Sequence, residues 1–356
     1  MNRFFVLLLA AWLPGWSFGQ NPSLPAGPKI PITTITQSVP VSPQYFKVEV
    51  PYYKEKMPQW SSGRIEVRSS TAAEMNVNPA DVLRLVRQGQ ADIGGAPLAT
   101  VSGDVPFLEV ADLAGLNPTL DQARRVMRAV SAAANQELEK FGIRIIGSYV
   151  FPGNVLFCKP PVKSFADLKG RKIRTFGPSL GDFVVAVGGQ PVSIAFGEVY
   201  SALERGTVDC AITGTQSANA TKWYEVTTNM YLLPLAWATS AYYANVKWWN
   251  GLAPEVRTFI ARSFEMIEEE QWQLARESTQ EGIDCNAGRK EGCKTSTLVQ
   301  KNPLQAVEPT EQDKAALKSI LSATVIPNWV KRCGVRCGEQ YNAVVAPITG
   351  VRYEAR

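Results

Sequence analysis

The feature that most constrains the fold is a regular alternation of short apolar segments with amphipathic segments along most of the chain. The short segments have the length of strands, and the amphipathic ones have helical periodicity. This alternation predicts an α/β fold in which parallel sheets are covered by helices. The predicted strands are residues 32–37, 65–68, 91–94, 107–110, 143–150, 154–158, 172–175, 191–194, 208–213 and 237–245, and the clearest helices are 79–87, 120–141, 180–187, 198–205 and 254–282.

The last predicted helix is unusually long. Pro254 suits the first turn of a helix, apolar residues recur at helical spacing from Val256 to Trp272, and nothing breaks the pattern before Gly282. About 28 residues at 1.5 Å per residue give a helix of roughly 42 Å, which exceeds a single small domain. We therefore expect this helix to brace two lobes, with a long helix inside one domain as the alternative.

The first residues have the pattern of an export signal. A basic start precedes an apolar run from Phe4 to Leu13, and the small residues Ser17 and Gly19 follow it. The apolar run is too short to cross a bilayer, which takes about 20 residues. We predict a cleaved signal peptide over residues 1–19 and an exported, soluble mature protein; an N-terminal membrane anchor is the alternative.

The composition removes several classes of function. The chain has no histidine, so Ser-His-Asp triads, HExxH motifs and Cys/His zinc sites are not available to it. Its formal net charge is +5, and the basic residues are scattered without the stripe that nucleic acid requires. We expect no cofactor, no metal and no nucleic-acid partner. An exported enzyme that uses carboxylates such as Asp182 or Asp209 stays open as an alternative.

Six cysteines in an exported chain indicate disulfides. Four of them form pairs that are close in sequence and are predicted to make two local bridges, Cys285 with Cys293 and Cys333 with Cys337. The remaining two, Cys158 and Cys210, lie in predicted core strands, where buried free thiols are favoured over a third bridge. Neither cluster offers a second cysteine pair at ligand spacing, so we do not expect them to bind metal.

A charged residue interrupts the predicted strand 172–175. A strand covered on both faces should be nearly all apolar, yet its third residue is Arg174. Ligands of such folds bind beyond the carboxyl ends of the strands, so Arg174 is expected to point into a cleft. Its fork-shaped guanidinium suits a bidentate grip on a carboxylate. The alternative is an internal ion pair with Asp209 or Glu198.

Several ordered motifs resemble one known family. They are GRIEV at 63–67, RLVRQGQADIGG at 84–95, SFADLKGRKIRTFG at 164–177, GGQPVSIAFGEVYSALERGTVDCAIT at 188–213, KWYEV at 222–226 and WWNGLAPEVRTFI at 248–260. In this order and spacing they resemble the extracytoplasmic substrate-binding proteins of tripartite ATP-independent periplasmic (TRAP) transporters, of the C4-dicarboxylate-binding type. The resemblance covers roughly residues 30–285, with a looser, cysteine-bearing tail.

The resemblance implies a two-lobed α/β binding protein, related to class II periplasmic binding proteins, that closes around an organic acid. It would deliver this acid to TRAP membrane permease subunits from the periplasm, without catalysis, and we expect a monomer. Chain order assigns residues 30–150 and 240–268 to the first lobe, and residues 151–239 and 269–345 to the second. A binding protein that reports its ligand to a sensory receptor is a further alternative.

The same resemblance assigns ligand-binding residues. Arg174 falls on the family's signature arginine, which holds the substrate carboxylate, and Phe196 matches an aromatic residue that packs against the ligand. Thr213 stands where asparagine is frequent, and Asn154 stands where some members have a second arginine, so a monocarboxylate or a 2-oxo or hydroxy acid becomes plausible. Position along the chain alone suggests two more ligand contacts, Gln37 and Trp237, although packing explains each of them as readily. The full predicted set is Arg174, Asn154, Phe196, Thr213, Phe176, Gln37 and Trp237.

Overall fold

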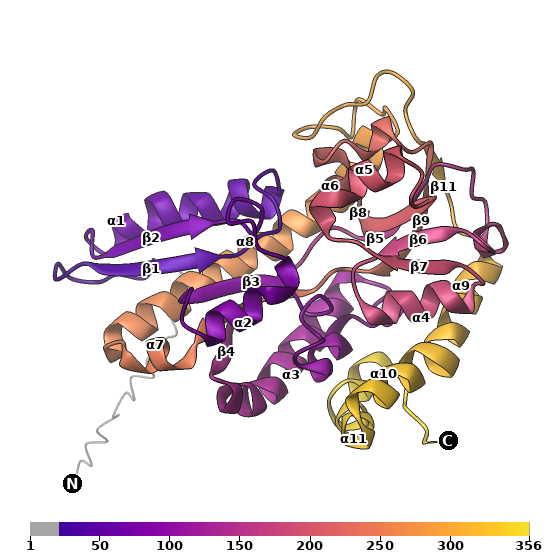
Figure 1. The fold of residues 1–356 in the computed structure, drawn as a ribbon. Helices are drawn as coiled ribbons and strands as arrows, with labels where there is room; N and C mark the ends of the chain where they lie inside the picture. Colours follow the sequence, from indigo (N-terminus) through magenta and orange to yellow (C-terminus); the bar gives the residue numbers. More distant parts are fainter. Residues whose placement is uncertain (1–20, 356) are drawn as a thin grey trace, which may run out of the picture.

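The computed structural model describes residues 21–355, which form two mixed β-sheets with helices packed around them (Figure 1). The predicted signal peptide, residues 1–19, lies outside the described residues. The first sheet is built mainly from the N-terminal part of the chain, and the second from the middle part. The α/β architecture with two lobes is therefore as predicted.

The first sheet has five strands. Three of them, β1, β2 and β3, run parallel, whereas β10 runs antiparallel to both of its neighbours, β3 and β4. The strands in spatial order are β2 (Ile65–Ser70), β1 (Ile30–Ile35), β3 (Ile93–Pro97), β10 (Ser240–Asn245) and β4 (Ile143–Tyr149).

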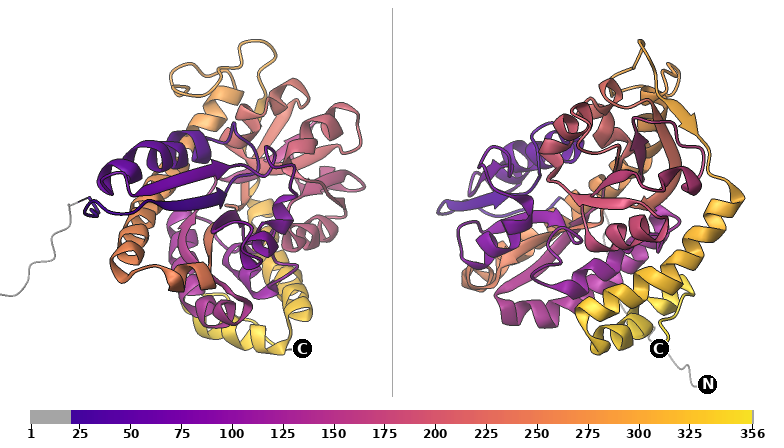
Figure 2. Two further views of the ribbon diagram at one scale, coloured as in Figure 1. Left: turned by 60° about the vertical axis from the view of Figure 1, so that its left-hand side comes forward. Right: turned by 45° about the vertical axis from the view of Figure 1, so that its right-hand side comes forward.

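The second sheet has six strands. Strand β6 is parallel to β7 and β8, whereas β5 is antiparallel to β8 and β9. The strands in spatial order are β11 (Gln305–Val307), β9 (Asn229–Ala236), β5 (Asn154–Cys158), β8 (Cys210–Gly214), β6 (Lys172–Thr175) and β7 (Gln190–Ser193). The two views of Figure 2 show the two sheets as separate bodies.

The expectation of wholly parallel sheets is wrong, and the connections explain why. The chain crosses directly from the first sheet to the second between β4 and β5, and returns between β9 and β10. A parallel neighbour needs a crossover connection that returns the chain to the same end of the sheet. The two direct crossings do not bring the chain back to the same end of one sheet. The strands that follow them, β5 and β10, run antiparallel to their neighbours.

Helices surround both sheets. The α-helices are α1 (Met57–Trp60), α2 (Val82–Arg87), α3 (Leu120–Leu138), α4 (Pro178–Ala186), α5 (Val199–Glu204), α6 (Thr215–Ala220), α7 (Val246–Gly251), α8 (Pro254–Asn286), α9 (Glu311–Ile320), α10 (Ile326–Cys333), α11 (Val335–Val344) and α12 (Ala346–Thr349). A π-helical segment, η1 (Gln44–Glu49), follows β1, and a 3₁₀ segment, η4 (Pro106–Asp112), precedes α3.

The long helix α8 contacts both lobes. It has 33 residues, which at 1.5 Å per residue is about 50 Å. On the first lobe, Trp272 Nε1 donates to Ser148 Oγ at 3.1 Å. On the second lobe, Asn286 Nδ2 donates to the main-chain oxygen of Thr215 at 3.0 Å, and α8 packs along α6. The prediction that this helix braces two lobes is confirmed, and the helix extends beyond the predicted end at residue 282.

Two predicted strands differ from the observed elements. Residues 107–110 lie in the 3₁₀ segment η4, which starts at Pro106, a residue suited to a first helical turn. The predicted strand 237–245 begins only at Ser240, because Ala238 has a left-handed backbone with φ of 46°. The strand before it, β9, was not predicted.

The C-terminal helices bridge the two halves of the molecule, as Figures 1 and 2 show. Helices α11 and α12 pack against α3, and Trp329 Nε1 donates to the main-chain oxygen of Pro106 at 2.9 Å. Arg332 forms an ion pair of 2.7 Å with Asp182 on α4. The exact lobe boundaries given above stay a prediction, since this segment contacts both sides.

Three disulfides are present. The bridges Cys285–Cys293 and Cys333–Cys337 form as predicted. Cys158 and Cys210 also form a disulfide, so the expectation of two free thiols is wrong. The reason is strand register: β5 and β8 are antiparallel neighbours that place these two residues directly opposite each other.

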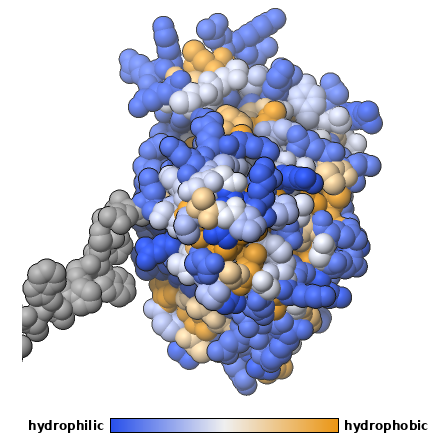
Figure 3. All heavy atoms as spheres, turned by 90° about the vertical axis from the view of Figure 1, so that its left-hand side faces the viewer, coloured by the Kyte–Doolittle hydropathy of each residue, from blue (hydrophilic) through white to orange (hydrophobic). Residues whose placement is uncertain are grey.

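Figure 3 shows a mostly hydrophilic surface, with apolar side chains gathered in patches near the middle of the face at the end of the first lobe. Among residues 21–355, no helix combines the length and apolar character needed to cross a membrane.

Candidate functional site

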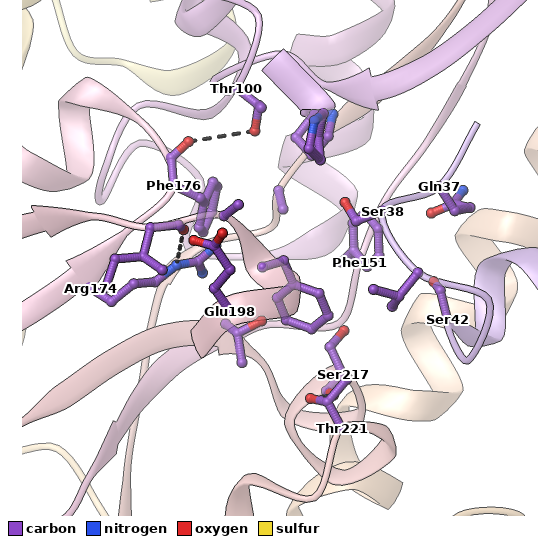
Figure 4. A pocket seen from close by; sticks show the side chains of 18 of the residues that line it. Gln37, Ser38, Ser42, Thr100, Phe151, Arg174, Phe176, Glu198, Ser217 and Thr221 are labelled. Atoms are coloured by element: carbon purple, nitrogen blue, oxygen red, sulfur yellow. Dashed lines mark hydrogen bonds between the residues drawn. The ribbon is translucent and has the colours of Figure 1, made fainter. Parts of the chain in front are cut away.

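A cavity of about 380 Å³ lies between the two sheets. The first half of the molecule lines it with residues that follow β1 and β3, including Ser38 and Thr100. The second half lines it with residues at the carboxyl ends of β6, β7 and β8, including Arg174 and Thr213. This is the position at which ligands bind in open α/β sheets. Figure 4 shows side chains from both halves facing the same space.

Arg174 extends from β6 into this cavity and is 3% exposed. Its Nε donates to the main-chain oxygen of Ile194, and its Nη1 to that of Ile212, each at 3.0 Å. The guanidinium carbon is 5.7 Å from the ring centre of Phe176 and 5.9 Å from that of Phe196. These contacts fix the plane of the guanidinium and offset part of the cost of burying its charge.

No acidic side chain lies within 4.0 Å of the Arg174 guanidinium anywhere in residues 21–355. The alternative of an ion pair with Asp209 is wrong, because Asp209 Oδ2 accepts a hydrogen bond from the main-chain nitrogen of Lys172 at 2.9 Å. Burial lowers the pKa of Arg174 to about 9, so the side chain is still a cation at neutral pH. Within the described residues, Arg174 is therefore a buried cation that forms no ion pair.

Asn154 and Thr213 also line the cavity and are almost fully buried. They come from the neighbouring strands β5 and β8, where Thr213 pairs with Val155. The Asn154 amide nitrogen donates to the main-chain oxygen of Pro152 at 2.9 Å. The structure thus brings Arg174, Asn154, Phe176, Phe196 and Thr213 to one cavity.

Gln37 lines the cavity from the first lobe, but its amide nitrogen is already bonded. Gln37 Nε2 donates to Glu49 Oε1 at 2.5 Å, and Glu49 also accepts hydrogen bonds from Thr36 and Tyr242. Glu49 is fully buried, and this burial raises its pKa to about 7. Glu49 Oε1 accepts from the Gln37 amide nitrogen, and this hydrogen bond orients the Gln37 side chain.

Trp237 does not line the cavity. Its Nε1 donates to the main-chain oxygen of Asn117 at 2.8 Å, and its main-chain nitrogen donates to the Asp112 carboxylate at 3.1 Å. Asp112 also accepts from the main-chain nitrogen of Thr239 at 3.1 Å, and thereby fixes the crossing between β9 and β10. These contacts agree with the interpretation of Trp237 as a packing residue, and its predicted contact with the ligand stays a prediction.

Some lining residues were not predicted from the sequence. Glu198 was named only as an alternative ion-pair partner of Arg174, yet it lines the cavity and makes neither that ion pair nor a capping hydrogen bond. The others lie in segments that follow a strand or at an end of a helix, and they include Ser38, Ser42, Thr100, Phe151, Ser217 and Thr221. A search for polar residues directly after predicted strands would have found Ser38.

Comparisons with known proteins agree with this architecture. The family model for bacterial extracellular solute-binding protein, family 7 (DctP), matches residues 40–322. The 2,3-diketo-L-gulonate-binding periplasmic protein YiaO of Escherichia coli K12 is 31% identical over 184 residues, which are 51% of this chain and 54% of that protein. The chain spans about half the length of the curated relatives it matches.

Solved structures share the fold over nearly the whole chain. DctP7 of Bordetella pertussis, an extracytoplasmic solute receptor that binds pyroglutamic acid, gives a TM-score of 0.77 at 20% identity, covering 88% of this chain and 99% of that one. A TRAP periplasmic solute-binding protein of Desulfovibrio salexigens with bound orotic acid gives 0.78 at 17% identity, covering 90% and 100%. By the family match, which spans most of its length, this chain belongs to the bacterial extracellular solute-binding proteins of family 7.

Proposed function

We propose that this protein is the periplasmic receptor of a TRAP transporter. It binds an organic acid in the cavity between its lobes and delivers the acid, chemically unchanged, to the membrane permease subunits. The ligands named for the three relatives above are all carboxylic acids or their anions, which supports this class of ligand. Neither the enzyme nor the sensory alternative gains support from these relatives.

The observation that carries the proposal is the state of Arg174. A buried cation that forms no ion pair is costly, and a ligand carboxylate would supply a direct partner for it. Each charge-assisted hydrogen bond contributes about 1.5–3 kcal/mol. Two such bonds would provide about half of the roughly 8 kcal/mol that micromolar binding requires. Phe176 and Phe196 would cover the apolar part of the ligand beside the guanidinium.

Binding would act through closure of the two lobes. In our proposal the lobes are residues 30–150 with 240–268, and 151–239 with 269–345, and they turn about the two crossings at 150–153 and 237–239. The lobes already touch at the cavity edge, where Thr100 Oγ1 donates to the main-chain oxygen of Phe176 at 3.5 Å. A ligand held by both lobes makes more contacts in the closed state, and so shifts the equilibrium toward it.

A thermal-shift screen of organic acids, followed by calorimetry of the hits, tests the proposal. A ligand at 100 times its dissociation constant should stabilise the protein by about 2.7 kcal/mol. The bound acid should be recovered intact after incubation. The proposal fails if no acid in a broad panel of mono- and dicarboxylates raises the melting temperature, or if the purified protein converts a bound acid into a product.

A further inference from the structure

Two side chains of opposite charge line the cavity. Of the cavity residues in the described part of the chain, only Arg174 and Glu198 are charged. Arg174 comes from β6, and Glu198 comes from the turn that starts α5. Figure 4 shows the Glu198 and Arg174 side chains both directed into the cavity. The formal charge of the lining in the described residues is therefore zero, with one cation and one anion that form no ion pair with each other.

The Glu198 carboxylate has no partner within residues 21–355. It forms no ion pair and accepts no hydrogen bond, although it stands at a helix start where a capping bond would be expected. The phenol of its neighbour Tyr200 donates instead to Glu225, at 2.7 Å. The carboxylate is thus free to accept hydrogen bonds from whatever fills the cavity.

The first lobe offers no second cation. None of the cavity residues that it contributes, within the described ranges, is lysine or arginine. Its Gln37 amide does not substitute for one, because an amide is neutral and one of its N–H groups is bonded to Glu49. A second carboxylate on the ligand would therefore meet no second cation in the cavity, whereas the negative Glu198 lines it. Like charges repel each other.

We propose that Glu198 accepts a hydrogen bond from a hydroxyl or N–H group on the ligand carbon adjacent to the carboxylate that Arg174 binds. This inference rests on the proposed function. It narrows the ligand to monocarboxylic acids with a donor next to the carboxylate, such as 2-hydroxy acids or cyclic 2-amido acids. It disfavours dicarboxylates, and also 2-oxo acids, which present an acceptor where Glu198 needs a donor.

Matched pairs of acids test this inference. The pairs are lactate with pyruvate, 2-hydroxyisocaproate with 2-oxoisocaproate, and gluconate with 2-ketogluconate, each differing only by hydroxyl or oxo at carbon 2. Glucarate, which differs from gluconate by a second carboxylate, tests the charge argument. The pair with the largest thermal shift is measured by calorimetry on the wild type, on Glu198→Gln and on Glu204→Gln. Glu204, exposed at the other end of α5 and outside the cavity, controls for the change in net charge.

The wild type should bind the hydroxy acid about tenfold or more tightly than the oxo acid, and gluconate more tightly than glucarate. Glu198→Gln should reduce the hydroxy/oxo ratio to within about threefold, because an amide can donate as well as accept. Glu204→Gln should keep the wild-type ratio.

Three results would overturn the inference while leaving the proposed function intact. They are equal binding of hydroxy and oxo acids by the wild type, binding only of acids that have no hydroxyl or N–H group on the carbon next to the carboxylate, and an equal gain for both acids in Glu198→Gln. The last result would mean that Glu198 only repels carboxylates. If no acid of any kind binds, the proposed function itself fails.

Discussion

Arg174 Nη1 donates a hydrogen bond of 3.0 Å to the main-chain oxygen of Ile212 on the neighbouring strand β8. Together with the bond from Nε to Ile194, it fixes the guanidinium before any ligand arrives. Neutral carbonyl groups orient the cation but do not neutralise it. The ligand-free protein therefore holds an oriented, buried cation that forms no ion pair, and this state has a cost in stability.

Replacing Arg174 with methionine should not destabilise the ligand-free protein. Methionine fills similar space without a buried charge, and such replacements are often neutral or stabilising by about 1–4 kcal/mol. The free energy of unfolding from urea titration measures the effect. Arg332→Met is the control, because Arg332 pairs with the buried Glu109 and with Asp182. The control should lose stability; a larger loss in Arg174→Met than in Arg332→Met would contradict the prediction.

The disulfides should differ in their contribution according to the length of chain they close. Cys158 and Cys210 are 52 residues apart, and Cys285 and Cys293 are 8 apart. On the loop-entropy relation, these bridges contribute about 4 and about 2.5 kcal/mol. Replacing both cysteines of each pair with alanine, and unfolding the variants in urea, should give losses in this order. The reverse order would show that the Cys158–Cys210 disulfide contributes little to the free energy of unfolding.

Gly282 should not tolerate a side chain. A Cβ at this position of α8 would lie 2.4 Å from the main-chain nitrogen of Gln216 and 2.5 Å from the carbonyl carbon of Thr215, in α6. We expect Gly282→Ala to lower the free energy of unfolding by about 1–3 kcal/mol, although alanine favours helix. Gly251→Ala, at an open position at the end of α7, is the control and should be near neutral. Equal stabilities would refute the close packing of α8 on α6.

Glu49 should make the protein less stable as the pH rises toward 8. Burial raises its pKa from 4.5 to about 7, so the folded protein favours the protonated form. Its contribution to stability is fully present below pH 4.5 and is lost as the pH rises through 7. The rise in the pKa of Glu49 corresponds to a loss of about 3 kcal/mol in the free energy of unfolding over this pH range.

Glu49→Gln should therefore gain stability relative to the wild type between pH 5 and pH 8. Urea unfolding at several pH values measures the difference between the two proteins. Glu55→Gln, which changes an exposed acid, should show a difference that does not vary with pH. If the difference in the free energy of unfolding between Glu49→Gln and the wild type also did not vary with pH, Glu49 would be ionised throughout this range.

Much of the site followed from local sequence. The charge of Arg174 in an apolar segment, and the turn directly after it, were enough to place it at the end of a strand facing a cleft. Strands β5 and β6 were predicted with their observed bounds, because each is a short run bounded by turn residues. Such features depend on residues that are close together in the chain, so they can be predicted from the sequence.

Other features depend on contacts between distant segments. The break between β9 and β10 is fixed by Asp112, more than 100 residues away from Trp237 in the chain, so the sequence predicted a strand from residue 237 to 245 and none before it. The Cys158–Cys210 bridge depends on the pairing of two strands that are separated by β6 and β7 in sequence. The sequence places Glu198 at the start of a helix. Only the assembled fold shows that this end of the helix faces the cavity.

The affinity of the best-binding acid for the wild type and for Arg174→Met, measured by isothermal titration calorimetry, tests the central claim most directly. We predict that Arg174→Met binds at least about 100-fold more weakly, since the carboxylate loses two charge-assisted hydrogen bonds. Arg332→Met, which keeps the cavity lining, should bind as the wild type does. An unchanged affinity in Arg174→Met would show that the buried cation does not hold the ligand.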